Sequence, residues 1–192
     1  DGYDMSKSTL IDALFQVTSF ITTTGYTTSN YENWPSTCIM LLVFLMFVGG
    51  CSSSTSGGLK VIRTTIVLRL IKRGISTRLH PHIYKTLRIS GRSIPRDTTS
   101  GVVSHVFLYI LLLFIGTFLI SFENLDLSSC FTSIIACLSN IGIGFSDVGI
   151  DKNFGFMSNF SKLVLTLFMI GGRLEGYTLF VLFTPYTWIR RG

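Results

Sequence analysis

The stretch LIDALFQVTSFITTTGYT (Leu10–Thr27) decides the fold, because an apolar segment runs directly into a glycine-containing loop rich in threonine. The part with helical character, Ser8–Ile21, has 14 residues. At about 1.5 Å per residue, it is too short to cross a bilayer core of roughly 30 Å. Acidic residues flank it on both sides: Asp1, Asp4 and Glu32. We therefore expect the chain to enter and leave the membrane from the same side, as a re-entrant loop.

A second copy of this arrangement lies further along the chain. The stretch SSCFTSIIACLSNIGIGF (Ser128–Phe145) again joins a short apolar segment, Leu127–Leu138, to a loop with glycine. Each copy is followed by a longer apolar segment with a Gly-Gly pair: LVFLMFVGG (Leu42–Gly50) in the first and LVLTLFMIGG (Leu163–Gly172) in the second. Such repetition predicts two structural repeats. The alternative is a pair of ordinary surface loops beside short core helices.

Composition favours a membrane protein. Of the 192 residues, 47% are hydrophobic and only 14% are charged, whereas soluble domains carry about 25% charged residues. The clearest membrane span is Gly101–Phe122. Two less uniform spans are Phe160–Phe183 and Trp34–Gly50, the latter continuing into Leu59–Ile71.

Basic residues are concentrated in one stretch. Ten of the sixteen Lys and Arg residues lie between Lys60 and Arg96, where Asp and Glu are absent. Because cytoplasmic loops are enriched in Lys and Arg, we expect residues 60–96 and the C-terminus to be cytoplasmic. The stretch could also contact anionic lipid or a partner protein. Since this clustering explains the net charge of +6, we expect no nucleic-acid partner.

The two loops have the composition of an ion filter. Potassium filters replace the hydration shell of the ion with rings of backbone carbonyl oxygens, and glycine supplies the positive φ that such loops need. We expect Thr22–Thr28 and Ser139–Gly144 to line a pore, since irregular backbone at membrane depth must line water or be buried in protein. Aligned on their glycines, both loops parallel the T-V-G-Y pattern of potassium channels. The candidate filter residues are Thr23, Thr24, Gly25 and Tyr26 in the first loop, and Asn140, Ile141, Gly142 and Ile143 in the second.

Three stretches resemble a known family. They are TTTGYTTSNYENWP (Thr22–Pro35), GGCSSSTSGGLKVIR (Gly49–Arg63) and SKLVLTLFMIGGRLEGYTLFVLF (Ser161–Phe183). In these the chain resembles the Trk/Ktr/HKT superfamily of potassium transporters, and within it the TrkH/TrkG-type potassium uptake subunits of bacteria. The resemblance implies an all-α membrane protein, built from helix–re-entrant pore helix–helix repeats around a central pore, as in potassium channels.

The family has four such repeats, of which this chain would hold the third and the fourth. Residues 1–75 would form the third repeat without its first helix, residues 76–98 a basic cytoplasmic linker, and residues 99–192 the fourth repeat. The chain departs from the family pattern at Ser53 and Ser56, where Gly and Ala are usual, and at Ile143, where Pro is common. We expect these departures to affect loop rigidity more than ion choice.

The resemblance also implies a gate. In GGCSSSTSGG (Gly49–Gly58), glycine and hydroxyl residues break an apolar helix, and the family has at this position a loop that obstructs the pore and moves on activation. A plain kink for close helix packing is the alternative. The candidate gate residues are Gly49, Gly50, Ser54, Thr55, Gly57, Gly58 and Arg173.

Two ionisable residues stand within the last apolar segment. Arg173 follows its Gly-Gly pair, as Cys51 follows the first. We expect Arg173 to be buried and either to bond oxygens of residues 51–56 or to form an electrostatic barrier to cations. Glu175 is expected to pair with Lys60 or Arg63. A purely structural buried ion pair is the alternative.

These expectations define the predicted function: a pore-forming subunit of a potassium uptake system in the bacterial inner membrane. A secondary carrier with broken helices, for another cation or a small solute, is the alternative. Enzyme activity is not expected, because no catalytic or nucleotide motif occurs and the histidines, His105 included, have no evident partner. No cofactor is expected, only K⁺ as the transported ion. The resemblance further implies a homodimer and a TrkA-like cytoplasmic regulatory subunit that binds nucleotide and docks on residues 60–96.

Overall fold

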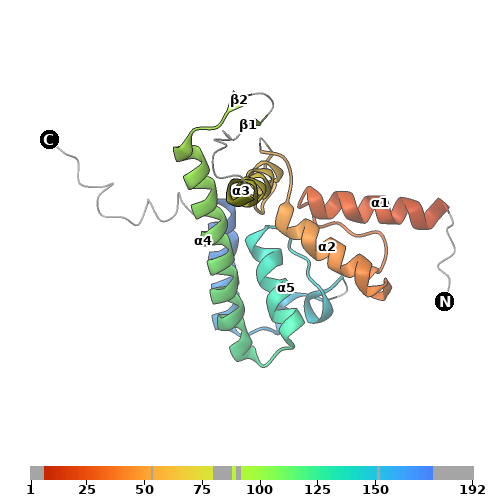
Figure 1. Ribbon diagram of the computed structural model, residues 1–192. Helices are drawn as coiled ribbons and strands as arrows, with labels where there is room; N and C mark the ends of the chain where they lie inside the picture. Colours follow the sequence, from red (N-terminus) through yellow and green to blue (C-terminus); the bar gives the residue numbers. More distant parts are fainter. Residues whose placement is uncertain (1–6, 53, 80–87, 90–91, 151, 175–192) are drawn as a thin grey trace.

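The computed structural model describes residues 7–52, 54–79, 88–89, 92–150 and 152–174. Six α-helices make up most of these residues (Figure 1). They are α1 (Lys7–Ile21), α2 (Ser36–Val48), α3 (Val61–Leu79), α4 (Arg96–Ile120), α5 (Leu127–Leu138) and α6 (Asn159–Arg173). Short 3-10 turns lie between them: η1 (Tyr31–Asn33), η2 (Ser121–Glu123), η3 (Ser146–Val148) and η4 (Phe154–Phe156).

The two short helices have nearly the predicted bounds. α5 covers the predicted segment Leu127–Leu138, and α1 begins one residue before the predicted Ser8. Both are apolar and, with 15 and 12 residues, too short to span a bilayer. Each ends in a loop, as the re-entrant interpretation requires.

α4 is the long helix of the chain. Within the described residues, the stretch Asp97–Glu123 alone is both long enough, at 27 residues, and apolar enough to cross a membrane. The sequence predicted a start at Gly101, but the helix begins five residues earlier, at Arg96. Pro95 precedes that first turn with φ −58°, a value already suited to a helix start.

A non-helical loop separates α2 from α3. α2 ends at Val48 because Gly49 adopts φ +63°, and α3 begins only at Val61. The two ends of the loop are hydrogen-bonded: the Leu59 N–H donates to the Phe47 carbonyl oxygen (3.0 Å), and the Val61 N–H to the Gly50 carbonyl oxygen (3.0 Å). The chain therefore leaves the helix and returns beside the same point.

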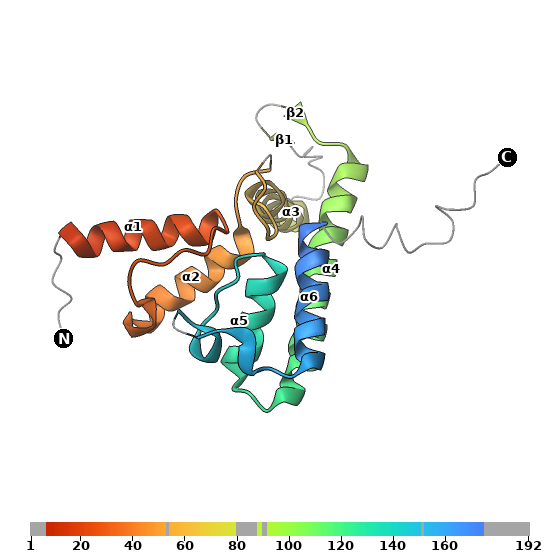
Figure 2. The same ribbon diagram turned by 180° about the vertical axis from the view of Figure 1, so that it is seen from behind.

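The core surrounds α5. Figures 1 and 2 show α4 and α6 side by side, with α5 against them and α2 on its other side. α1 contacts α2 and extends away from this group. Most of the buried apolar side chains come from four helices, and Phe20 of α1 joins them: they include Leu42 and Met46 of α2, Tyr109, Leu113 and Ile120 of α4, Ile134, Ile135 and Leu138 of α5, and Val164 and Leu165 of α6.

The basic stretch contains more regular structure than a linker. α3 continues to Leu79, so the boundary expected after residue 75 falls inside a helix, as does the one expected after residue 98. Between α3 and α4, β1 (Arg88–Ile89) pairs antiparallel with β2 (Arg92–Ser93). These two-residue strands are the one departure from an all-helical fold among the described residues.

Candidate ion pathway

The two filter loops have the same backbone conformation. Positive φ occurs at Thr23 (55°) and Gly25 (77°) in the first loop, and at Asn140 (55°) and Gly142 (87°) in the second. Positive φ is uncommon for residues other than glycine. Its recurrence at corresponding positions therefore shows that the alignment on the glycines has a structural counterpart. Residues that alternate in the sign of φ can aim successive carbonyls to one side, as a carbonyl-lined filter requires.

The hydrogen bonds that end the pore helices also correspond. In the first repeat, backbone N–H groups donate from Thr22 to Thr18, from Thr23 to Phe20 and from Thr24 to Ser19 (2.9, 3.3 and 3.0 Å). In the second, the same pattern runs from Ser139 to Ile135, from Asn140 to Cys137 and from Ile141 to Ala136 (2.8, 3.0 and 2.8 Å). Each short helix thus passes into its loop through the same three bonds.

The loops meet at the first glycine. A Cβ placed on Gly25 would lie 2.2 Å from the Ile141 carbonyl oxygen, so the Gly25 backbone packs directly on that oxygen. A larger residue has no room there, because the obstacle is backbone. The structure thus brings the predicted filter residues of the two repeats together.

The loop between α2 and α3 lies against the inner ends of both filter loops. The Gly57 N–H donates to Thr23 Oγ1 (3.1 Å), and a Cβ on Gly57 would lie 2.0 Å from the Ser139 carbonyl oxygen. Hydroxyls also close the loop on itself. The Gly50 N–H donates to Ser56 Oγ (3.1 Å), and the Ser56 and Ser54 hydroxyls are bonded to each other (2.7 Å). Of the predicted gate segment, Ser53 alone lies outside the described residues.

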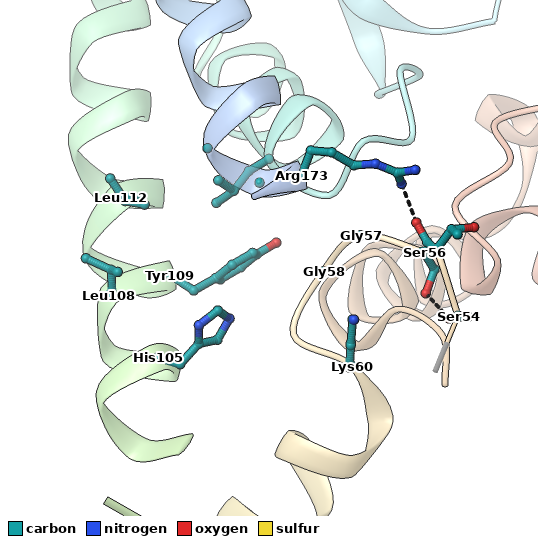
Figure 3. A pocket seen from close by; sticks show the side chains of 14 residues that line it. Ser54, Ser56, Gly57, Gly58, Lys60, His105, Leu108, Tyr109, Leu112 and Arg173 are labelled. Carbon is teal, nitrogen blue, oxygen red and sulfur yellow. Dashed lines mark hydrogen bonds between the residues drawn. The ribbon is translucent and has the colours of Figure 1, made fainter. Parts of the chain in front are cut away.

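Arg173 occupies the last turn of α6 and reaches across to this loop. Its Nη1 donates to the Thr55 carbonyl oxygen (Figure 3), which lies in the segment that the sequence pointed to. The expectation of a buried side chain was wrong, since Arg173 is exposed in this chain. Arg173 is the last residue of α6, and its guanidinium extends from the end of the helix toward the loop. Glu175 and its predicted pairing lie outside the described residues.

A cavity of about 200 Å³ separates the loop from α4 and α6. Figure 3 shows Lys60, His105 and Tyr109 projecting into it, with Arg173 above. The expectation that His105 has no partner was wrong, because its Nε2 lies 3.1 Å from Nη1 of Arg63. Spacing along the sequence could not reveal this pair, which joins α3 to α4.

Comparison with known proteins settles the family. The family described as TrkH, cation transport protein, matches residues 4–188. This chain belongs to the TrkH family. Among its relatives, the Trk system potassium uptake protein TrkH of Salmonella typhimurium is 37% identical over 97% of the chain. The Trk system potassium uptake protein TrkG of Escherichia coli is 31% identical over the same share.

The fold of the TrkH family is confirmed as well. The crystal structure of the potassium transporter TrkH from Vibrio parahaemolyticus superposes with a TM-score of 0.87 and 34% identity, over 97% of this chain and 39% of that one. The chain spans 38% of the length of the Salmonella and Escherichia relatives. The predicted family and the predicted all-helical membrane fold are therefore both borne out.

The side-chain contacts that hold the two predicted filter loops of this TrkH-family chain were not predicted from the sequence. Ser139 Oγ donates to the Met46 carbonyl oxygen (2.9 Å) and is bonded to the hydroxyl of Tyr109 (2.8 Å), which links α2, α4 and the second loop. Tyr31 Oη donates to the Gly144 carbonyl oxygen (2.7 Å). Both contacts join residues far apart in the chain, so no local pattern indicates them.

Proposed function

We propose that this chain forms part of the conducting pore of a bacterial potassium uptake system. K⁺ would pass along the backbone carbonyls of Thr23–Tyr26 and Asn140–Ile143. The TrkH family and the potassium uptake proteins among the relatives support the choice of ion. Filter loops of further repeats would complete the pore, since the chain spans 38% of these relatives.

One observation carries the proposal: two loops of different sequence share one backbone and meet. The three matched hydrogen bonds and the matched signs of φ give both loops the same course, although their side chains differ. The close approach of Gly25 to the Ile141 carbonyl oxygen supports a lining in which the two loops are neighbours. A carbonyl-lined filter selects ions through backbone oxygens, and therefore tolerates such side-chain variation.

The test is a full-length chimaera, in which this chain replaces the matching 38% of the Salmonella TrkH. In a bacterium without its own potassium uptake systems, we expect the chimaera to restore growth at low K⁺ and to take up K⁺ in preference to Na⁺. Uptake of another cation or a small solute with no K⁺ uptake would contradict the proposal and favour the carrier alternative. Deletion of residues 22–26 provides the inactive control.

We further propose that the loop between α2 and α3 gates this pore, through Gly49, Gly50, Ser54, Thr55, Gly57, Gly58 and Arg173. Two contacts support this role: that of Gly57 with Thr23 of the first filter loop, and that of Arg173 with Thr55. We expect Arg173→Ala to raise K⁺ flux through the chimaera. Arg173→Lys separates the two possible mechanisms: an electrostatic barrier survives this change, whereas a guanidinium bond to Thr55 does not. Unchanged flux in both variants would contradict the gate assignment.

The remaining expectations are part of the same proposal. The protein would cross the bacterial inner membrane several times with residues 60–96 and the C-terminus in the cytoplasm, and it would transport K⁺ without a cofactor or enzymatic turnover. It would act as a homodimer, with residues 1–75 and 99–192 as successive repeats joined by the linker 76–98. A nucleotide-binding, TrkA-like regulatory subunit would dock on the basic stretch. Five of the basic residues of this stretch lie on α3: Arg63, Arg69, Lys72, Arg73 and Arg78.

A further inference from the structure

A buried tyrosine links the two filter loops from behind. Tyr31 opens η1, six residues after Gly25, and its side chain is 0% exposed. Its hydroxyl donates to the carbonyl oxygen of Gly144 at 2.7 Å. Gly144 lies two residues beyond Gly142, so this bond runs from one repeat to the outer end of the filter loop in the other. A buried polar group without a partner is costly, which ties the position of this carbonyl to the tyrosine.

The ring of Tyr31 packs in a cluster that spans the same interface. It meets Phe20 edge-on at 5.4 Å between ring centroids and Phe145 edge-on at 5.0 Å. Phe20 and Phe145 stack on each other at 6.1 Å. Phe20 belongs to the last turn of α1, and Phe145 directly follows Gly144. Hydroxyl and ring thus act on the same short segment of the second filter loop.

The second repeat of this chain, which contains Gly144, also holds this segment through its own hydrogen bonds. The Gly144 N–H donates to the Val148 carbonyl oxygen (2.9 Å), and the Phe145 N–H donates to Thr132 Oγ1 (3.3 Å). The first bond ties the segment to η3, and the second ties it to its own pore helix, α5. Tyr31 adds the fixed point on the neighbouring repeat, and the two sets of contacts together determine how far apart the loops stand.

We propose that Tyr31 is a positioning residue for ion selectivity, which holds the filter loops of adjacent repeats at the spacing that favours K⁺ over Na⁺. This inference rests on the proposed function. Selectivity has been ascribed to the size of the filter and to the number of carbonyls that reach the ion, and on either account it depends on the distance between the loops. Tyr31 would not be an ion ligand itself, because its buried hydroxyl donates to the Gly144 carbonyl oxygen.

The test is Tyr31→Phe in the full-length chimaera, which keeps the ring and removes the hydroxyl. We expect the ratio of K⁺ to Na⁺ uptake to fall by about two- to tenfold, the factor that corresponds to a buried hydrogen bond of ordinary strength. The matched control is Ser133→Ala. It removes another buried hydroxyl, but one that donates to the Cys130 carbonyl oxygen one turn back in α5 and not to a filter loop. A ratio that falls equally in both variants, or in neither, would overturn the inference.

A second variant keeps the test decisive if Tyr31→Phe does not reach the membrane. Phe20→Leu leaves the hydroxyl in place and loosens the ring cluster, and we expect it to lower the same ratio to a smaller degree. The unsubstituted chimaera separates the two proposals. If it does not favour K⁺, the proposed function fails and this inference with it. If it favours K⁺ and Phe20→Leu changes nothing, the inference alone fails.

Discussion

The two pore helices differ far more in their surroundings than in their structure. α5 packs against α2, α4 and α6, and its residues from Ser129 to Leu138 are buried except Phe131, which is half-buried. α1 has its main helix contact with α2, and Leu10, Ile11 and Leu14 are more than half exposed. Both nevertheless end in the same three hydrogen bonds and the same pattern of φ. The backbone of both loops is therefore specified by the end of the pore helix and the glycine, and not by what covers the helix.

The Gly-Gly pairs after the two loops, by contrast, have the same sequence but different structures. Gly49 and Gly50 end α2, whereas Gly171 and Gly172 remain inside α6. The Gly-Gly pair does not decide whether the helix continues, since it is the same in both repeats. The residues that follow decide this. CSSSTSGG supplies hydroxyls whose hydrogen bonds close a loop, while Arg173 and Leu174 let α6 complete its last turn.

The largest expected effect contrasts the two filter glycines. Gly25→Ala combines a positive φ with a clash against the Ile141 carbonyl oxygen, whereas a Cβ on Gly142 would meet no atom of the described residues within 4 Å, its chain neighbours aside. We expect Gly25→Ala to reduce K⁺ uptake by more than about tenfold and Gly142→Ala to act only through backbone strain of about 1–2 kcal/mol. Uptake by the two chimaera variants checks this. Equal losses would reveal that a filter loop of another repeat, outside this chain, packs on Gly142.

A smaller effect, on stability, contrasts the helices that carry the loops. Ile134 of α5 is fully buried, and a Cβ on Gly116 of α4 would lie 2.9 Å from its Cδ1. Ile134→Ala would leave a cavity in this packing and is expected to cost about 2–4 kcal/mol. Leu14→Ala, on the exposed face of α1, is expected to cost less than about 1 kcal/mol. Thermal unfolding in detergent measures both. A large loss for Leu14→Ala would show that another part of the full-length protein covers α1.

A third prediction concerns the hydroxyls that close the loop between α2 and α3, the proposed gate. Ser56→Ala removes the acceptor of the Gly50 N–H and the partner of the Ser54 hydroxyl. Loss of about 0.5–1.5 kcal/mol of hydrogen bonding should favour the open loop and raise K⁺ flux by about two- to tenfold. Thr65→Val is the control, because its hydroxyl bonds only one turn back along α3. Flux that stays the same in Ser56→Ala would mean that the loop is held by its backbone contacts alone.

The sequence predicted what depends on neighbours along the chain. Helix length and glycine spacing gave α5 and its loop, and the run of glycine and serine gave the break after Val48. The contacts that join repeats could not be predicted, because they depend on how the helices pack. Nothing in the sequence around Tyr31 indicates its hydrogen bond to Gly144. Nothing around Gly57 indicates its close contact with Ser139. The site was thus predictable as a set of segments, and not as a set of contacts.

The smallest effect concerns the bond that ties each pore helix to the loop beyond its filter. In the first repeat the acid is on the helix, where Asp12 accepts from the Thr28 hydroxyl (3.1 Å). In the second it is on the loop, where Asp147 accepts from Ser129 of the helix (3.1 Å) and pairs with Lys152 (3.0 Å).

The Lys152 ammonium, and then the Ser129 hydroxyl, hold the pKa of Asp147 below its usual value. Because the carboxylate form is the one stabilised, this contribution is complete above the ordinary carboxyl pKa and is lost as the pH falls through the lowered pKa of the folded protein.

Asp147→Asn puts an amide at the position that corresponds to Asn30 in the first repeat, and so removes this acid-sensitive tie. We expect the melting temperature of the full-length chimaera to fall between pH 5 and pH 3 by slightly more than that of the Asp147→Asn variant. The difference is small because both side chains of the ion pair are exposed, by 53% for Lys152 and 40% for Asp147. Lys152→Gln, which leaves the bond to Ser129, should give an intermediate dependence on pH. Parallel curves for all three proteins would show that water stabilises the Asp147 carboxylate as well as its two partners do.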